Sequence, residues 1–129
     1  KIRHFETYNR TAASQLVADI VAAIRATPGA ALVASGDAAI ASLLAAAIAE
    51  PRVAVLNVGE FDTSSDDDFV RRLYIPGLRR AGDLQTAAAL AGNRVVIHNA
   101  GEHFALRGVE VDRKKMSPRD IATAIRTAR

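Results

Sequence analysis

The chain has 129 residues, no cysteine and a formal net charge of +3. A chain of this length is expected to form one α/β domain spanning residues 1–129. Half of the residues are hydrophobic but only 5% are aromatic, so the core should consist of small and branched aliphatic side chains. The lack of cysteine excludes disulfide bonds and thiolate metal sites. No apolar run reaches about 18 residues, the length that a transmembrane helix needs. The small excess of basic residues does not favour nucleic acid as a partner.

The amino-terminal part of the chain alternates between helix and strand patterns. Apolar residues recur at helical spacing from residue 12 to residue 26, and Pro28-Gly29 ends this helix. The run Ala31-Leu32-Val33 is typical of a parallel strand that is covered on both faces. A turn at Ser35-Gly36 then leads into a helix for which Asp37 is the expected cap.

The middle of the chain repeats this alternation. Residues 53–58 predict a second buried strand, and Gly59 to Asp62 form the loop at its carboxyl end. Three consecutive acids, Asp66 to Asp68, are interpreted as the first turn of a short helix that continues to Leu73, because their spacing does not fit a calcium loop. A further helix is expected from Asp83, as its cap, to Ala91.

The carboxyl-terminal part supplies the last strands and helix. Residues 94–98 predict a third buried strand, and residues 108–112 a weaker one at a sheet edge, because polar and apolar side chains alternate in it. Ser117 is the expected cap of the final helix, with Pro118 at its first position.

This order of elements predicts a three-layer α/β fold with a mainly parallel sheet of about four or five strands. If the strands are added in chain order, right-handed crossovers place most helices on one face of the sheet and only the last helix on the other. The strands nevertheless carry apolar residues toward both faces. We therefore expect a partner to cover the thinner face, either a second copy in a homo-oligomer or an amino-terminal half that precedes Lys1.

Several segments together resemble a known family. They are His4 to Thr11, Ser35-Gly36-Asp37, Phe61-Asp62, Leu73 to Leu78 and His98 to Gly101. The chain resembles the carboxyl-terminal half of an α/β-hydrolase-fold protein of the acetyl xylan esterase or dienelactone hydrolase-like group. The resemblance covers nearly all of this chain and about half of the family fold.

The resemblance implies a catalytic triad whose nucleophile lies on a G-x-S-x-G turn between strand and helix. The matching stretch here is Ala34-Ser35-Gly36-Asp37-Ala38, in which Ser35 stands one position early. By position, Asp62 or Glu102 would be the acid and His103 the base. No histidine occurs from Asp112 to Arg129, where the family histidine follows the last strand. The resemblance therefore implies a catalytically degenerate domain with a structural or interaction role.

Two other functions stay open on the sequence alone. A weak carboxyl-ester hydrolase would use Ser35 as its nucleophile. An anion- or nucleotide-binding module would use the N–H groups at the Ser35-Gly36 turn, although Asp37 would compete for them and no P-loop lysine follows. His98, at the end of an apolar strand, is interpreted as a packed and hydrogen-bonded core residue. We expect neither a metal site nor a cofactor.

Overall fold

A computed structural model describes residues 12–65 and 80–128. In these residues the sheet has four strands, all parallel, and they are hydrogen-bonded in the order in which they occur in the chain. The predicted α/β class, the parallel sheet and the number of strands are therefore confirmed. The strands are β1 (Ala31–Ser35), β2 (Val53–Asn57), β3 (Val95–His98) and β4 (Glu110–Val111).

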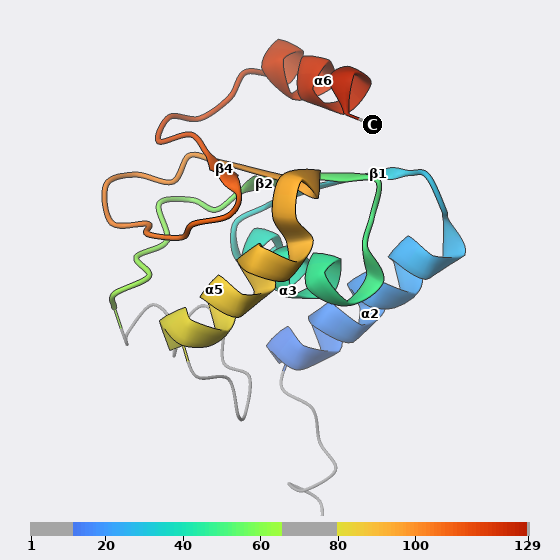
Figure 1. Cartoon of the computed structure of the whole chain (residues 1–129), viewed down its shortest axis with the longest axis horizontal. Helices are drawn as coiled ribbons and strands as arrows, with labels where there is room; N and C mark the ends of the chain where they lie inside the picture. Colours follow the sequence, from blue (N-terminus) through green and yellow to red (C-terminus); the bar gives the residue numbers. More distant parts are fainter. Residues whose placement is uncertain (1–11, 66–79, 129) are drawn as a thin grey trace, which may run out of the picture.

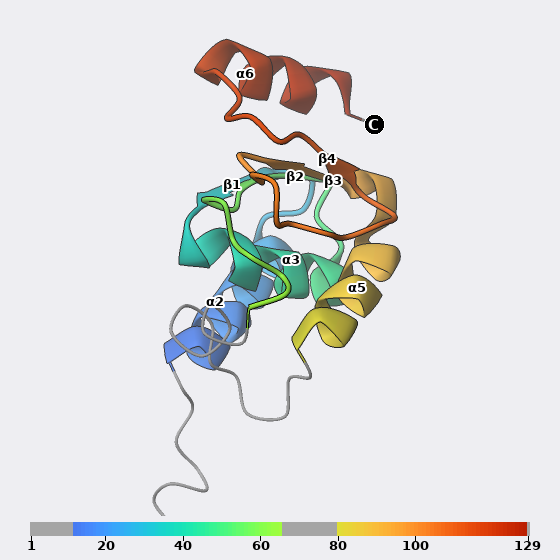
Figure 2. The same ribbon diagram turned by 90° about the vertical axis from the view of Figure 1, so that its left-hand side faces the viewer.

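The helices are divided unequally between the two faces of the sheet (Figures 1 and 2). Each connection between neighbouring parallel strands is a crossover, and because crossovers are right-handed, successive steps in one direction place their helices on the same side. Helices α3 (Asp37–Ala49) and α5 (Arg80–Ala91) lie in two of these crossovers and therefore share one face, and α2 (Ala12–Ala26), which precedes β1, packs against α3 on the same face. Of the described helices, α6 (Pro118–Thr127) alone lies on the other face, against β2. A 3-10 turn, η1 (Gly92–Arg94), leads into β3.

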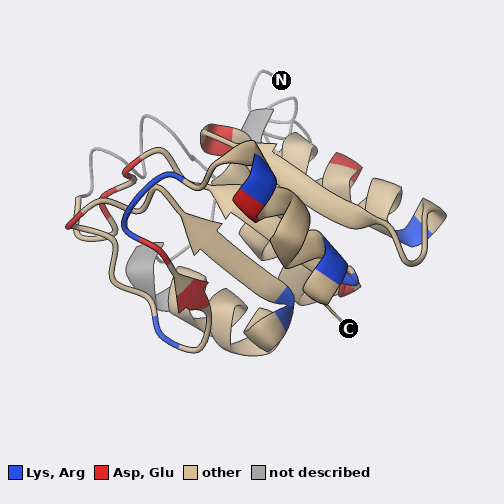
Figure 3. Ribbon diagram, turned by 90° about the horizontal axis from the view of Figure 1, so that it is seen from above, with Lys and Arg blue, Asp and Glu red and all other residues tan. Residues whose placement is uncertain are grey.

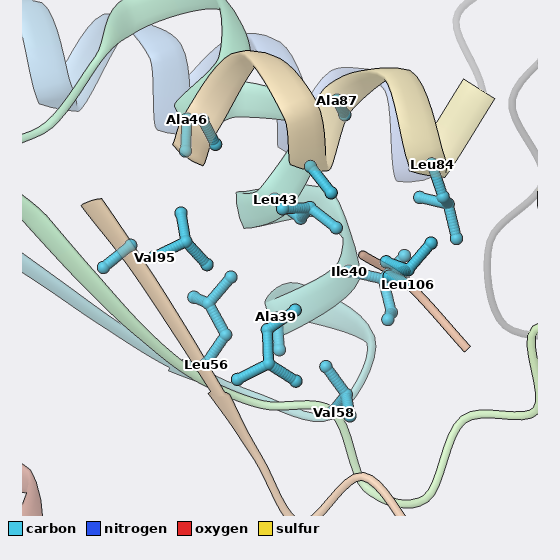
Figure 4. Close-up of a cluster of buried hydrophobic side chains, with 14 of the residues drawn as sticks. Ala39, Ile40, Leu43, Ala46, Leu56, Val58, Leu84, Ala87, Val95 and Leu106 are labelled. Atoms are coloured by element: carbon cyan, nitrogen blue, oxygen red, sulfur yellow. The ribbon is translucent and has the colours of Figure 1, made fainter. Parts of the chain in front are cut away.

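The main core lies between the sheet and α3, α5 and α2 (Figure 4). Alternate residues of each strand point into it, such as Leu56 of β2 and Ile97 of β3, both fully buried. Ile40 and Leu43 face them from α3 and are also fully buried. Many of the remaining contacts are made by alanines, which allow the helices to approach closely, as the alanine-rich and aromatic-poor composition predicts.

The two edge strands differ in how well the sequence predicts them. The prediction of an edge strand within residues 108–112 is confirmed, but the strand is shorter than predicted: β4 consists of Glu110–Val111 and, among the described residues, pairs with β3 alone. The prediction that Ala31-Leu32-Val33 is covered on both faces is wrong. β1 is the other edge strand, and the side chain of Val33 is 53% exposed, because α6 lies over β2 and does not extend across β1.

Among the predicted helix caps, one is likewise confirmed and two are wrong. Ser117 Oγ accepts a hydrogen bond from the Asp120 N–H at 3.1 Å and Pro118 is the first helical residue, as predicted. Asp37 is not the cap of α3. It is the first helical residue, and Gly36 occupies the cap position without a side-chain hydrogen bond. Asp83 does not cap α5 either, because the helix already includes Arg80.

Some predictions fall outside the described residues. The extended segment at residues 2–8, the interpretation of Asp66 to Asp68 and the helix that continues to Leu73 all lie there. Among the described helices, none combines the length and the hydrophobicity required for a membrane span.

Candidate functional site

The carboxyl ends of the parallel strands form one edge of the sheet, where α/β proteins usually bind ligands. The cross-strand register aligns Ser35 of β1 with Asn57 of β2, and Asn57 with His98 of β3. Each of these residues ends an apolar strand. Because residues in register on neighbouring strands point to the same face, the three side chains form a polar row directed toward the side of the sheet that carries α6.

Gly36 forms the turn from β1 into α3. Its backbone has φ 67° and ψ −138°, a left-handed conformation close to a region that is essentially restricted to glycine. The turn is anchored by a 2.8 Å hydrogen bond from the Gly36 N–H to the Asn57 carbonyl oxygen. The strained position between strand and helix is thus residue 36, the centre of Ala34-Ser35-Gly36-Asp37-Ala38, and Ser35 precedes it as the last residue of β1.

A cavity of about 280 Å³ opens on the α6 side of this edge. The polar row Ser35, Asn57 and His98 forms its floor, together with Val33 and Ala34 of β1. The segment between β4 and α6 and the first turns of α6 form its opposite wall. Figure 3 shows Lys and Arg residues of that segment beside the start of α6. The residues of the opposite wall are Lys115, Met116, Pro118 and Ile121.

Asn57 holds the loops at this edge in place. Its side-chain oxygen accepts hydrogen bonds from the Gly59 N–H at 3.0 Å and from Asn99 Nδ2 at 2.9 Å. These bonds join the loop after β2 to the loop after β3, and Asn99 itself adopts a left-handed φ of 55°. Asn57 therefore has a positioning role, and sequence analysis did not single it out.

His98 is 2% exposed, and its Nδ1 accepts a hydrogen bond from the Met116 N–H at 2.9 Å. Its interpretation as a packed, hydrogen-bonded residue is confirmed. Burial lowers the pKa of its imidazole, and the nearby charge of Lys115 lowers it further, while Asp112 acts in the opposite direction. Because Nδ1 is an acceptor, the neutral ring carries its proton on Nε2. In this tautomer Nε2 is a donor and does not act as a general base.

The loop that carries Asp62 lies beside the loop that carries His103, because Thr63 donates hydrogen bonds to the His103 carbonyl oxygen from its N–H and its hydroxyl. Asp62 Oδ1 accepts hydrogen bonds from the hydroxyl and the backbone N–H of Ser64, at 2.6 Å and 2.8 Å. These two bonds lower the pKa of the Asp62 carboxyl, desolvation opposes them, and the charge of His103 makes the smallest contribution, which also lowers the pKa. His103 is exposed, and its carbonyl oxygen accepts from the N–H of Thr63 at 3.1 Å.

Ser35 lies apart from Asp62 and His103. The cavity beside Ser35 is lined neither by Asp62 nor by His103. Glu102 is exposed in the loop after β3. Of the four residues proposed for a triad, Asp62 and His103 therefore lie on neighbouring loops, and Ser35 lies with Asn57 and His98 instead.

No group of three or more metal-ligating side chains capable of holding an ion occurs among the described residues. His4, which a three-histidine site would require, lies outside them. Comparison of the chain with protein-family models, curated proteins and solved structures gives no match.

Proposed function

We propose that this chain is an α/β-hydrolase-like domain that is catalytically degenerate and has a structural or interaction role. Its parallel sheet, with three helices on one face and the final helix on the other, is compatible with the resemblance in the sequence. The resemblance itself rests on the sequence motifs, and the geometry of the candidate site supports the loss of catalysis.

The observation that carries the proposal is the conformation of Gly36. A nucleophile elbow presents its serine on the strained turn between strand and helix, and here that turn is formed by a residue without a side chain. An added Cβ at Gly36 would meet no atom within 4 Å. Space for a side chain is therefore available, and the missing group is the nucleophile itself.

The histidine position supports the same conclusion. The segment from β4 into α6, where the family histidine would be expected, carries Lys115 and Met116. The buried imidazole nearest to Ser35 in the strand register, that of His98, is committed through Nδ1 to the Met116 N–H. Neither arrangement provides a base with a free nitrogen lone pair beside Ser35.

Hydrolysis of p-nitrophenyl acetate tests this proposal. We expect the same background rate for the unmodified chain, for Ser35→Ala and for the matched control Thr127→Ala, which removes an exposed hydroxyl near the end of α6. A rate that falls in Ser35→Ala but not in Thr127→Ala, with unchanged circular dichroism, would contradict the proposal.

One observation favours a carboxyl-ester hydrolase as the second candidate. Asp62 and His103 lie on neighbouring loops, and the charge of His103 makes the smallest of the contributions that lower the pKa of the Asp62 carboxyl. In that case activity would be lost in His103→Gln and in Ser35→Ala alike. Activity that depends on His103 but not on Ser35 would exclude this version of the site.

An anion- or nucleotide-binding module remains the third candidate. The first turn of α3 receives no side-chain cap from Gly36, which favours binding of an external acceptor, whereas the adjacent carboxylate of Asp37 disfavours an anion. A nucleotide-induced rise in the melting temperature that is weakened in Gly36→Ala but kept in Gly29→Ala would support it; the two glycines have similar positive φ angles and room for an added Cβ.

The interaction role is supported by the uncovered strand β1. One edge of β1 pairs with β2, its other edge has no strand partner among the described residues, and Val33 is exposed beside it. We expect a second copy of the chain or another polypeptide segment to cover this surface. Light scattering of the purified chain tests the homo-oligomer, and a stable monomer at micromolar concentration would exclude it.

A further inference from the structure

We propose that the cavity between the carboxyl edge of the sheet and the start of α6 binds a short-chain aliphatic carboxylate. This inference goes beyond the proposed structural role and does not depend on the family resemblance. It is carried by three properties of the described residues: the kind of polar groups in the cavity, their lack of other partners, and the apolar wall opposite them.

The charged and hydroxyl groups of the cavity are donors. They are the Ser35 hydroxyl, the Nε2–H of His98 and the ammonium of Lys115, and no acidic side chain lines the cavity. Asp112 acts electrostatically on His98, but it does not line the cavity and its Oδ1 accepts from the Lys114 N–H at 2.9 Å. Donors with one positive charge are complementary to an acceptor with one negative charge.

These donors are available. Among the described residues, Ser35 Oγ, His98 Nε2 and Lys115 Nζ make no hydrogen bond or ion pair. The His98 side chain is almost completely buried, but its Nε2 is not a fully buried unsatisfied atom, so a ligand or water in the cavity can supply its acceptor. A carboxylate has two oxygens, so it can accept from groups on different strands, as Ser35 and His98 are.

The other wall of the cavity is apolar. Met116, Pro118 and Ile121 face the sheet from the α6 side, and Val33 continues the apolar surface along β1. Val33 is the most exposed large apolar side chain in the described part of the sheet. The volume of about 280 Å³ suits a small ligand with a short alkyl chain, since drug-sized ligands occupy sites of roughly 300–1,000 Å³.

The site is preorganised. Asn57 is held by its two accepted hydrogen bonds, and the His98 ring is fixed by the Met116 N–H. The His98 donor therefore loses little freedom when a ligand binds. A cation is disfavoured by Lys115, and an uncharged alcohol would leave the ammonium without a counter-charge.

Titration of the full chain followed by nuclear magnetic resonance tests the proposal with three ligands that share one alkyl chain: hexanoate, hexanol and hexylamine. We expect hexanoate to shift the His98 ring signals, assigned by their loss in His98→Asn, and to bind at least about tenfold more tightly than the other two. Equal binding of hexanol, or no hexanoate-dependent change at His98, would overturn the proposal.

Two neighbouring lysines provide a matched pair of variants. Lys115→Gln removes the charge that lines the cavity, and Lys114→Gln removes the adjacent charge that does not line it. We expect hexanoate affinity to fall about tenfold in Lys115→Gln and to stay within about twofold in Lys114→Gln. Equal losses in the two variants would show attraction by the basic segment as a whole and would overturn the proposal.

The contribution of the Ser35 hydroxyl to hexanoate binding is tested with its own variant. Ser35→Ala should weaken hexanoate about fivefold without affecting hexanol, and an unchanged affinity would overturn the role of Ser35. Ester hydrolysis in the unmodified chain would contradict the proposed function and leave carboxylate binding intact, so the two proposals fail independently.

Discussion

The two faces of the sheet are built from the same strands but are protected very differently. On one face, α2, α3 and α5 cover alternate residues of every strand, and Leu56 and Ile97 are fully buried. On the other face, α6 covers β2, where Val55 is also fully buried, but Val33 on β1 is exposed. The three-helix face therefore provides most of the core, and the α6 face combines partial cover with the candidate site.

The largest expected change in the free energy of unfolding comes from a core substitution on the three-helix face, compared with one on the α6 face. Leu56→Ala should lower the free energy of unfolding by about 2–5 kcal/mol, because it leaves a cavity in the three-helix face. Ile121→Ala on the half-buried side of α6 should cost about 1–2 kcal/mol, since less area is lost. Urea unfolding measures both, and equal losses would show that the two faces contribute equally.

The next largest loss of stability is expected when the hydrogen bonds that hold α6 in place are removed. Arg52 donates hydrogen bonds to the carbonyl oxygens of Gly29 at 2.9 Å and Ile125 at 3.2 Å, so its side chain joins β2 to the end of α6. Arg52→Met should lower the free energy of unfolding by about 1.5–3 kcal/mol and speed amide exchange in α6. The control Arg126→Met removes an exposed charge whose bond to Thr123 stays within the helix, and should change stability by at most about 0.5 kcal/mol.

Acid should weaken the α6 face through His98. The pKa of His98 is lower in the folded chain than its ordinary value of 6.5, so below that pH the unfolded state takes up the proton more readily. This contribution to stability is therefore present above pH 6.5 and is lost as the pH falls through the folded pKa. His98→Asn, which keeps an acceptor for the Met116 N–H, should show a smaller loss of stability between pH 7.5 and pH 5.5. An unchanged pH dependence would assign the effect to other groups.

The smallest effect concerns the three-helix face. Ser42 of α3 is completely buried, and its Oγ has no hydrogen-bond partner among the described residues. Ser42→Ala should raise the free energy of unfolding by about 0.5–1 kcal/mol, because it removes an unsatisfied polar atom and favours the helix. A lower melting temperature would indicate that the hydroxyl has a partner.

The helices and strands that could be predicted are those marked by a pattern within a few neighbouring residues of the sequence. Apolar runs and their flanking turns indicated the positions of β2 and β3, and Ser117-Pro118 fixed the start of α6. The start of α3 was less predictable, because the positive φ of Gly36 makes it the cap in place of Asp37, a residue type with stronger capping preference.

The candidate site depends on information that a single strand does not contain. Ser35, Asn57 and His98 each end an apolar run, and this shared feature was the available signal for the row. Their alignment, however, depends on cross-strand register, in which a shift of one residue would turn a side chain to the other face. Lys115 joins them only because α6 returns across the sheet, and nothing in the local sequence around Lys115 specifies that contact.

The agreement between strand order and chain order has a consequence for how the molecule forms during synthesis. Each strand can pair with the strand made immediately before it, so the sheet can grow from β1 to β4 without waiting for a later segment. The three-helix face is complete once β4 has been made, because Phe104, Leu106 and Val111 belong to its core. The α6 face closes only when the segment after β4 docks, and because Lys115, Met116 and Ile121 arrive with it, the proposed carboxylate site is the last part of the described fold to assemble.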